Sequence, residues 1–279
     1  MVERRIKSLL VPYMSFVLLL LLADVIKYMG FGLIPWYWKL KNLFGVALGG
    51  TFTVERFGPI WFLTCLFMVT ISYNYAIGKL GSPATLKFVL LAVVSVAIAT
   101  LITFSPFKPS PWGLLTVPAA FFFFWAGHVL AGIGIGNRRA IIFVLVVLLL
   151  SYAAYQCGSA FKLNMKDCKV DPPVLGLFLA AALSLIFMWL SRLLAPLFNE
   201  RLLQILGECT LTIMMLHQYV HYSLEEFGIK GVWLTVTISF LIPLGLHFIL
   251  LTTPATRMLF LGRSPTSFPS KKVSTSLSS

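Results

Sequence analysis

The side chains of this chain that could move a proton lie within its apolar stretches. His217 and His221 are four residues apart and share one face of a helix, which Glu208 enters from a neighbouring side. His128 and His247 lie in two further apolar stretches. Imidazole titrates near neutral pH, so such a residue can serve as a general base. We take His217 and His128 as the candidates for this role; the alternative for each is a hydrogen-bonded packing residue.

The same side chains do not predict a metal site or a phosphate-binding loop. Two histidines four residues apart can hold a metal, but the sequence has no HExxH motif and no nearby group of carboxylates. The sequence also lacks GxSxG, GxxxxGK[ST] and a GxGxxG between a strand and a helix. We therefore expect no bound metal and no resident cofactor.

Two opposite charges, Asp24 and Lys27, lie three residues apart near the end of the first apolar stretch. Placing an ionisable side chain in the hydrocarbon core of a membrane costs free energy, so such a residue is a candidate for a functional role. Their spacing on one helix face favours a mutual ion pair, and a role in a polar site is the alternative.

Membrane-spanning helices must position these candidates. Of the 279 residues, 59% are hydrophobic and only 11% are charged, which is too few to cover a water-exposed surface. A span takes about 20 apolar residues, and helices satisfy their own backbone groups in lipid. The sequence predicts an all-α fold, a polytopic membrane helix bundle of about eight transmembrane helices. The expected spans are residues 9–30, 59–78, 86–105, 114–134, 140–158, 174–192, 203–222 and 232–251.

Lys and Arg gather in short loops and at the termini. The net charge of +13 would suit a nucleic-acid-binding protein, but no basic stripe with interleaved aromatic residues lies outside the spans. We expect membrane lipid as the partner and no nucleic acid. The termini and one set of loops carry 13 Lys and Arg, against 9 on the opposite side. This bias favours a multi-pass protein of the cell (inner) membrane with both termini in the cytoplasm.

One membrane domain is expected over residues 1–262. Residues 263–279 are rich in Ser, Thr, Pro and Lys, which predicts a disordered cytoplasmic tail. The long connection 31–58 contains the run WYWKLK at 36–41, typical of an interfacial belt; a lid or cleft is the alternative.

The four cysteines do not form a disulfide framework. Cys65 and Cys209 fall inside spans and are expected to be packing residues. Cys157 and Cys168 flank a polar loop on the outer side, where a disulfide could form if that face is oxidising.

Three strings of residues, taken in order, resemble motifs of the acyltransferase-3 family. Residues 4–13 (RRIKSLLVPY) resemble its basic R-x-x-R followed by L-L-x-P-Y at the start of a helix. Residues 58–63 (GPIWFL) resemble its G-P-x-W-F-L, and residues 206–217 (LGECTLTIMMLH) are similar to its L-G-x-x-S-L-x-I-Y-x-x-H. The Phe-rich segment 118–130 is a looser match. The nearest resemblance within the family is to fucose 4-O-acetylase-like and polysaccharide O-acetyltransferase-like members.

This resemblance implies an integral membrane enzyme that transfers an acyl group, usually acetyl from acetyl-CoA, to a cell-envelope carbohydrate or glycolipid acceptor. It implies that Arg5 contacts the phosphates of CoA, because a guanidinium pairs with phosphate oxygens. It implies that Trp61 stacks on the acceptor sugar, and it aligns His217 with the histidine of the late motif. A positive-inside anchor and an interfacial aromatic residue are the alternatives for Arg5 and Trp61.

The sequence also departs from the family pattern. The family's first two helices, which carry its catalytic histidine, have no counterpart here, and Ser8 stands at the second Arg of R-x-x-R. We therefore expect the 1–262 domain to be N-terminally incomplete and the chain alone to be inactive. The alternative functions are a membrane transporter or flippase of glycan or lipid, and a non-enzymatic membrane protein.

Overall fold

Apart from one short hairpin, the regular structure of the computed structural model is helical. The structure describes residues 2–31, 36–53, 55–106, 110–134 and 136–262, so the expected tail at 263–279 lies outside the described residues. The helices before the hairpin are α1 (Val2–Arg5), η1 (Ile6–Leu10), α2 (Val11–Phe31), α3 (Trp36–Ala47), η2 (Glu55–Ile60), α4 (Trp61–Leu80), α5 (Leu86–Thr103), η3 (Pro111–Thr116), α6 (Val117–Ile133) and α7 (Arg138–Gln156).

A hairpin joins α7 to the last group of helices. Its strands are β1 (Lys162–Asn164) and β2 (Lys169–Asp171), paired antiparallel with Leu163 opposite Val170. The helices that follow are α8 (Leu175–Leu194), η4 (Ala195–Leu197), α9 (Glu200–Glu226), α10 (Val232–Leu250) and α11 (Pro254–Leu261). The sequence did not predict the two strands, which are too short to carry a periodic pattern.

The all-α membrane bundle is confirmed. Seven helices in the described residues are long and apolar enough to cross a membrane. They match seven of the eight expected spans. The eighth, expected at 203–222, lies within α9, which has 27 residues. Glu208, His217 and His221 make α9 more polar than the other long helices, so it is not among the seven.

The N-terminal and C-terminal parts of the chain share a core. This core joins α2, η2, α4, α9 and α10 and has as its largest fully buried side chains Phe16, Leu20, Phe57, Ile60, Leu63 and Met215. A second core joins α4, α5 and α6 through Tyr73, Phe88 and Phe121, whose rings lie 5.2 to 5.9 Å apart. The remaining buried apolar residues join α6, α7 and α8.

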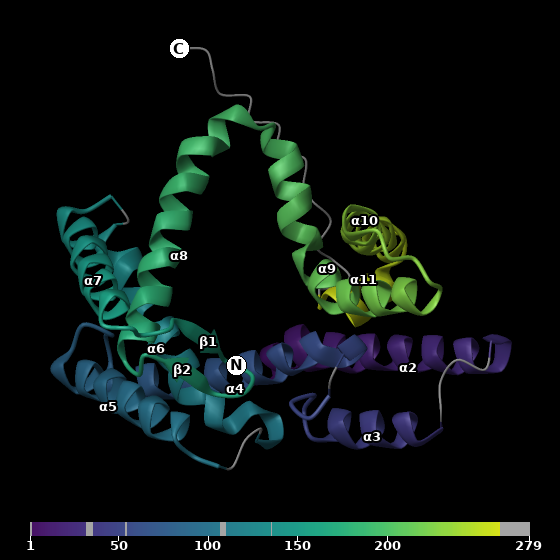
Figure 1. The fold of residues 1–279 in the computed structure, drawn as a ribbon, viewed down its shortest axis with the longest axis horizontal. Helices are drawn as coiled ribbons and strands as arrows, with labels where there is room; N and C mark the ends of the chain where they lie inside the picture. Colours follow the sequence, from purple (N-terminus) through teal and green to yellow (C-terminus); the bar gives the residue numbers. More distant parts are fainter. Residues whose placement is uncertain (1, 32–35, 54, 107–109, 135, 263–279) are drawn as a thin grey trace.

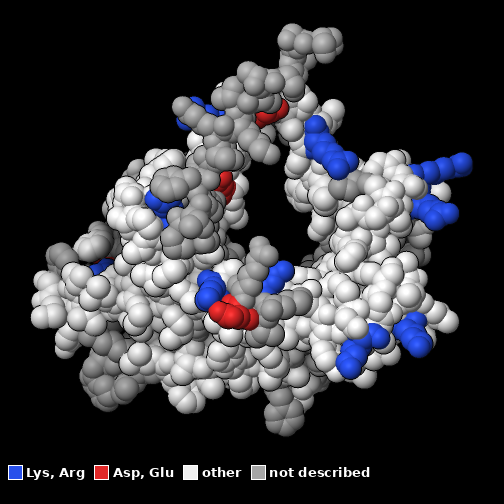
Figure 2. Space-filling model, turned by 180° about the vertical axis from the view of Figure 1, so that it is seen from behind, with Lys and Arg blue, Asp and Glu red and all other residues white. Residues whose placement is uncertain are grey.

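Figure 1 shows α8 and the first part of α9 rising apart from the rest of the molecule and meeting at η4. In the space-filling view an opening lies between these two arms, with Lys and Arg side chains near its rim (Figure 2). The arms carry uncovered apolar side chains, among them Leu193 and Leu197 at 74% and 76% exposure. Such exposure suits contact with lipid rather than with water.

The two ends of the described chain lie against each other. The ring of Phe16 in α2 packs edge-on against that of Phe260 in α11, with centroids 5.2 Å apart. A Cβ placed on Gly262 would lie 2.8 Å from the Cα of Ser8. The start of α2 and the end of α11 are therefore on the same side of the bundle.

The cysteines differ in part from expectation. Cys65 and Cys209 are buried packing residues, as predicted. The suggested Cys157–Cys168 disulfide is not formed in this structure. Cys168 turns inward, with its Sγ 3.2 Å from the Oγ1 of Thr116, whereas Cys157 is exposed at the end of α7.

Candidate functional site

The three motif segments meet in the first core described above. Tyr13 comes from the first segment, Ile60 from the second, and Met215 and Leu216 from the third, and all four are buried together. The hydroxyl of Tyr13 also donates to the carbonyl of Val46 at 2.6 Å, which fastens α2 to α3. Segments far apart in sequence thus form one unit around the start of α4.

Gly58 allows the second and third segments to approach closely. A Cβ placed on Gly58 would lie 2.2 Å from the Oε1 of Gln218, which is the neighbour of His217 in α9. Any other residue at this position would push the side chain of Gln218 aside. The glycine of G-P-x-W-F-L therefore has a packing role against α9 in this structure.

Next to this contact lies a group of polar side chains, Asp24, Lys27, Arg56, Ser223 and Glu226, which we call the polar cluster. Arg56 donates from Nη1 to the Oδ1 of Asp24 at 3.4 Å and pairs through Nη2 with Glu226. Lys27 donates from Nζ to the Oε2 of Glu226 at 2.9 Å and to the Oγ of Ser223 at 2.7 Å. The cluster joins the end of α2, the η2 segment before Trp61 and the end of α9.

The polar cluster is largely removed from solvent. The side chains of Asp24, Lys27 and Arg56 are 5%, 11% and 15% exposed, and that of Glu226 is 24% exposed. The Nε of Arg56 has no hydrogen-bond partner among the described residues. Buried charges are tolerated when they are paired, so two cations and two carboxylates balance each other here.

The expected Asp24–Lys27 ion pair is not formed. Within the described chain, each of the two residues instead pairs with a residue outside α2: Asp24 with Arg56, and Lys27 with Glu226. Sequence reasoning missed Arg56, Ser223 and Glu226. The available signal was the position of Arg56, two residues before the G-P-x-W-F-L string.

The structure fixes the orientation of the His217 ring. Its Nδ1 lies 3.0 Å from the carbonyl oxygens of both Ile213 and Met214. A carbonyl only accepts, so Nδ1 carries the proton and the Nε2 of a neutral ring keeps its lone pair. This tautomer suits a proton acceptor, although the same hydrogen bonds also suit a packing residue.

The other histidines are placed differently. His128 is exposed on α6 with its ring centroid 6.0 Å from that of Tyr73. His221 lies 3.4 Å from the Oε1 of Glu225, one turn along the same helix. The Nδ1 of His247 lies 3.0 Å from the Oγ1 of Thr212, in the buried contact between α9 and α10. No group of three or more metal-ligating side chains occurs in the described part of the chain.

Trp61 and Arg5 lie on different helices. Trp61 opens α4, is half-buried, packs edge-on against Phe62 with centroids 6.2 Å apart, and contacts the second core, formed by α4, α5 and α6. Arg5 is exposed at the end of α1, before the start of α2. From Arg5 to Asp24 the chain is helical, a rise of roughly 28 Å, so Arg5 is far from the polar cluster. The η1 segment that follows Arg5 packs against α4.

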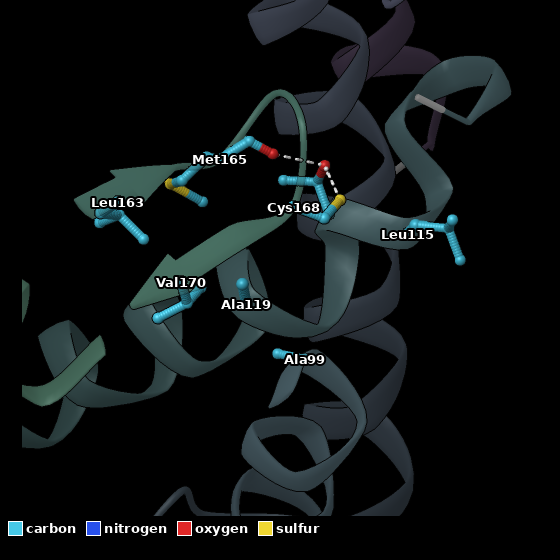
Figure 3. A pocket seen from close by; sticks show the side chains of 8 residues that line it. Ala99, Leu115, Ala119, Leu163, Met165, Cys168 and Val170 are labelled. Carbon is cyan, nitrogen blue, oxygen red and sulfur yellow. Dashed lines mark hydrogen bonds between the residues drawn. The ribbon is translucent and has the colours of Figure 1, made fainter. Parts of the chain in front are cut away.

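The hairpin holds the loop before η2 in place. Lys166 donates from Nζ to the carbonyl of Thr53, and burial lowers the pKa of this ammonium group below its ordinary value. Beneath the hairpin is a small apolar pocket, shown in Figure 3, where the hydroxyl of Thr116 donates to the carbonyl of Met165 at 2.9 Å. The pocket has space for about one water molecule, so it is a packing defect rather than a substrate site.

Comparison with known protein families matches residues 1–252 to the acyltransferase domain of the acyltransferase-3 family. The match includes all three motif segments and the whole polar cluster. The chain belongs to the acyltransferase-3 family. No curated protein and no solved structure matches the chain significantly.

Membership of the acyltransferase-3 family and the seven apolar helices make this a multi-pass membrane protein of an acyltransferase family. Within the acyltransferase domain, Gly58 places η2 against Gln218, the neighbour of His217, and the polar cluster joins the same two elements, η2 and α9. Arg5 is remote from the polar cluster, and His128 is exposed.

Proposed function

We propose that this protein takes part in transferring an acyl group, acetyl in the simplest case, from acyl-CoA to a carbohydrate of the cell envelope. The observation that carries the proposal is the joining of the three motif segments around the start of α4 within a matched acyltransferase domain. The donor, the acceptor and the cell membrane as location are part of the proposal.

The donor is proposed to bind at the end of the bundle that carries Arg5. The guanidinium there is exposed and can pair with phosphate oxygens of CoA. Both described ends of the chain lie on this side, which we propose to be cytoplasmic because the larger share of Lys and Arg is found there. This is the side on which acyl-CoA would be available.

The acceptor is proposed to bind next to Trp61, because an indole ring can stack on the face of a sugar and Trp61 is half-buried at the start of α4. In the transfer step, which requires the thioester end of CoA to extend from the phosphates at Arg5 to the acceptor, the acceptor hydroxyl attacks the thioester carbonyl, the C–S bond breaks and the CoA thiolate leaves. A base takes the hydroxyl proton, and the Nε2 of His217 is the candidate on this chain.

The test separates donor binding from turnover, because the sequence leads us to expect little turnover by this chain alone. Membranes containing the chain are given acetyl-CoA labelled in the acetyl group, and both bound label and labelled carbohydrate are measured. If labelled acetyl-CoA binds to the wild type and to Arg192→Ala but not to Arg5→Ala, the result supports the proposed donor site at Arg5. If labelled acetyl-CoA does not bind specifically, the proposed donor is wrong.

A further inference from the structure

An apolar groove lies between α6, α7 and α8, away from the polar cluster. It has a volume of about 310 Å³ and is lined by carbon, apart from the side chain of Arg139. Three alanines, Ala126, Ala140 and Ala181, leave the space open, one from each helix. The volume is at the lower end of the ~300–1,000 Å³ typical of small-molecule pockets.

The groove follows the direction of the helices. One end is closed by Phe122 and Phe178, whose ring centroids are 5.1 Å apart. From Phe122 to Ile133, a lining residue at the end of α6, the rise along the helix is roughly 16 Å. The lining residues of α6 thus extend over about three helical turns, a length that can accommodate an extended hydrocarbon chain.

A positive charge lies at the open end of the groove. Ile133 is exposed there, and Arg139 lies at the start of α7 with its side chain exposed. No carboxylate pairs with Arg139 in the described part of the chain. A guanidinium at the helix ends is at the depth of lipid phosphates, whereas the groove behind it is at the depth of acyl chains.

We propose that this groove binds one acyl chain of an anionic phospholipid, with the lipid phosphate held by Arg139. The apolar groove complements the acyl chain of such a lipid, and the cationic side chain of Arg139 at its open end complements the phosphate. The proposal is independent of the proposed transferase function, because none of the residues placed in that function lines the groove.

Trp125 lines the groove and provides a built-in probe. The purified full chain in detergent is titrated with phosphatidylglycerol that carries brominated acyl chains, which quench nearby tryptophans. The part of the quenching that is lost in Trp125→Phe comes from Trp125 and reports binding in the groove. The part that remains comes from the other six tryptophans. We expect the Trp125 part to be saturable, to be lost in Ala126→Leu, and to require about fivefold more lipid in Arg139→Gln.

Arg192→Gln is the matched control, since Arg192 is also an exposed arginine near a helix end but does not line the groove. It should titrate like the wild type. The proposal is overturned if brominated phosphatidylcholine quenches Trp125 equally well, if Ala126→Leu with an unchanged melting temperature binds as before, or if Arg139→Gln and Arg192→Gln behave alike.

Discussion

The guanidinium of Arg56 lies between two helices and contacts the carboxylate of Asp24 at 3.4 Å. Through this contact and its pair with Glu226, the segment that precedes Trp61 is attached to both α2 and α9. The position of the family's G-P-x-W-F-L segment thus depends on charges contributed by two other parts of the chain.

Replacing Arg56 by Leu should leave Lys27 as the one remaining cation for the largely buried carboxylates of Asp24 and Glu226 in the polar cluster, so that Asp24 loses its partner. We expect a loss of about 3 kcal/mol in the free energy of unfolding, typical of a buried ion pair that loses one partner. Thermal unfolding in detergent measures it. Lys7→Ala, which breaks the exposed pair with Glu3, should leave the free energy of unfolding almost unchanged. Equal losses in the two variants would contradict the role of the polar cluster.

Gly58→Ala should destabilise the protein through one flexible neighbour, Gln218. The second change Gln218→Ala removes that neighbour and should restore most of the loss. Gly49→Ala is the contrasting variant: the residue has a φ of +83°, and the new Cβ would lie 2.8 Å from the Cα of Trp112. Its cost should be about 2 kcal/mol and not reversible by any single side-chain truncation. Melting temperatures of the variants distinguish the cases.

His217→Gln should abolish labelled-carbohydrate formation wherever the protein is active, if the Nε2 of His217 is the base. Donor binding measured with labelled acetyl-CoA should not change, because the residue is remote from Arg5. His221→Gln, one turn further along α9, should retain turnover. Activity of His217→Gln at the wild-type level assigns this histidine to packing alone.

Lys166 predicts a pH dependence of stability. Because burial lowers its pKa in the folded protein, the folded state disfavours the charged ammonium more than the unfolded state does. The resulting cost is fully present below the folded pKa and disappears as the pH rises toward the ordinary value of 10.5. The stability difference between wild type and Lys166→Met should therefore shift in favour of the wild type with rising pH. A difference that is constant with pH would show that Lys166 is not desolvated.

Cys157 offers a test of orientation. It is the exposed cysteine of the four, and the other three are buried. A membrane-impermeant maleimide added to intact cells should label the chain at Cys157 alone, because α7 is proposed to end on the outer side. Cys157→Ser should abolish labelling. Labelling only after the cells are opened would reverse the proposed orientation.

Hydropathy predicted the long helices well, because the cost of unsatisfied backbone groups in lipid leaves few alternatives for an apolar run of 20 residues. It could not predict the partners of Asp24 and Lys27. Their spacing favoured a local pair, but Arg56 and Glu226 outcompete it, and only tertiary packing brings these residues to α2.

The cysteine prediction failed for a similar reason. Cys157 and Cys168 flank one loop in sequence, but the hairpin turns Cys168 toward Thr116 and away from the surface. For the candidate site, sequence similarity identified Trp61 and His217, and the structure added the neighbours that hold them. The separation of Arg5 from the polar cluster follows from the length of α2 and could have been anticipated from the spans.

The contact between Phe16 and Phe260 has a consequence for biogenesis. Helix α2 cannot complete its packing until α11 has been synthesised. At about 5–20 residues per second, this wait is on the order of tens of seconds. During that time the uncovered face of α2 needs lipid, or the insertion machinery, as a temporary neighbour.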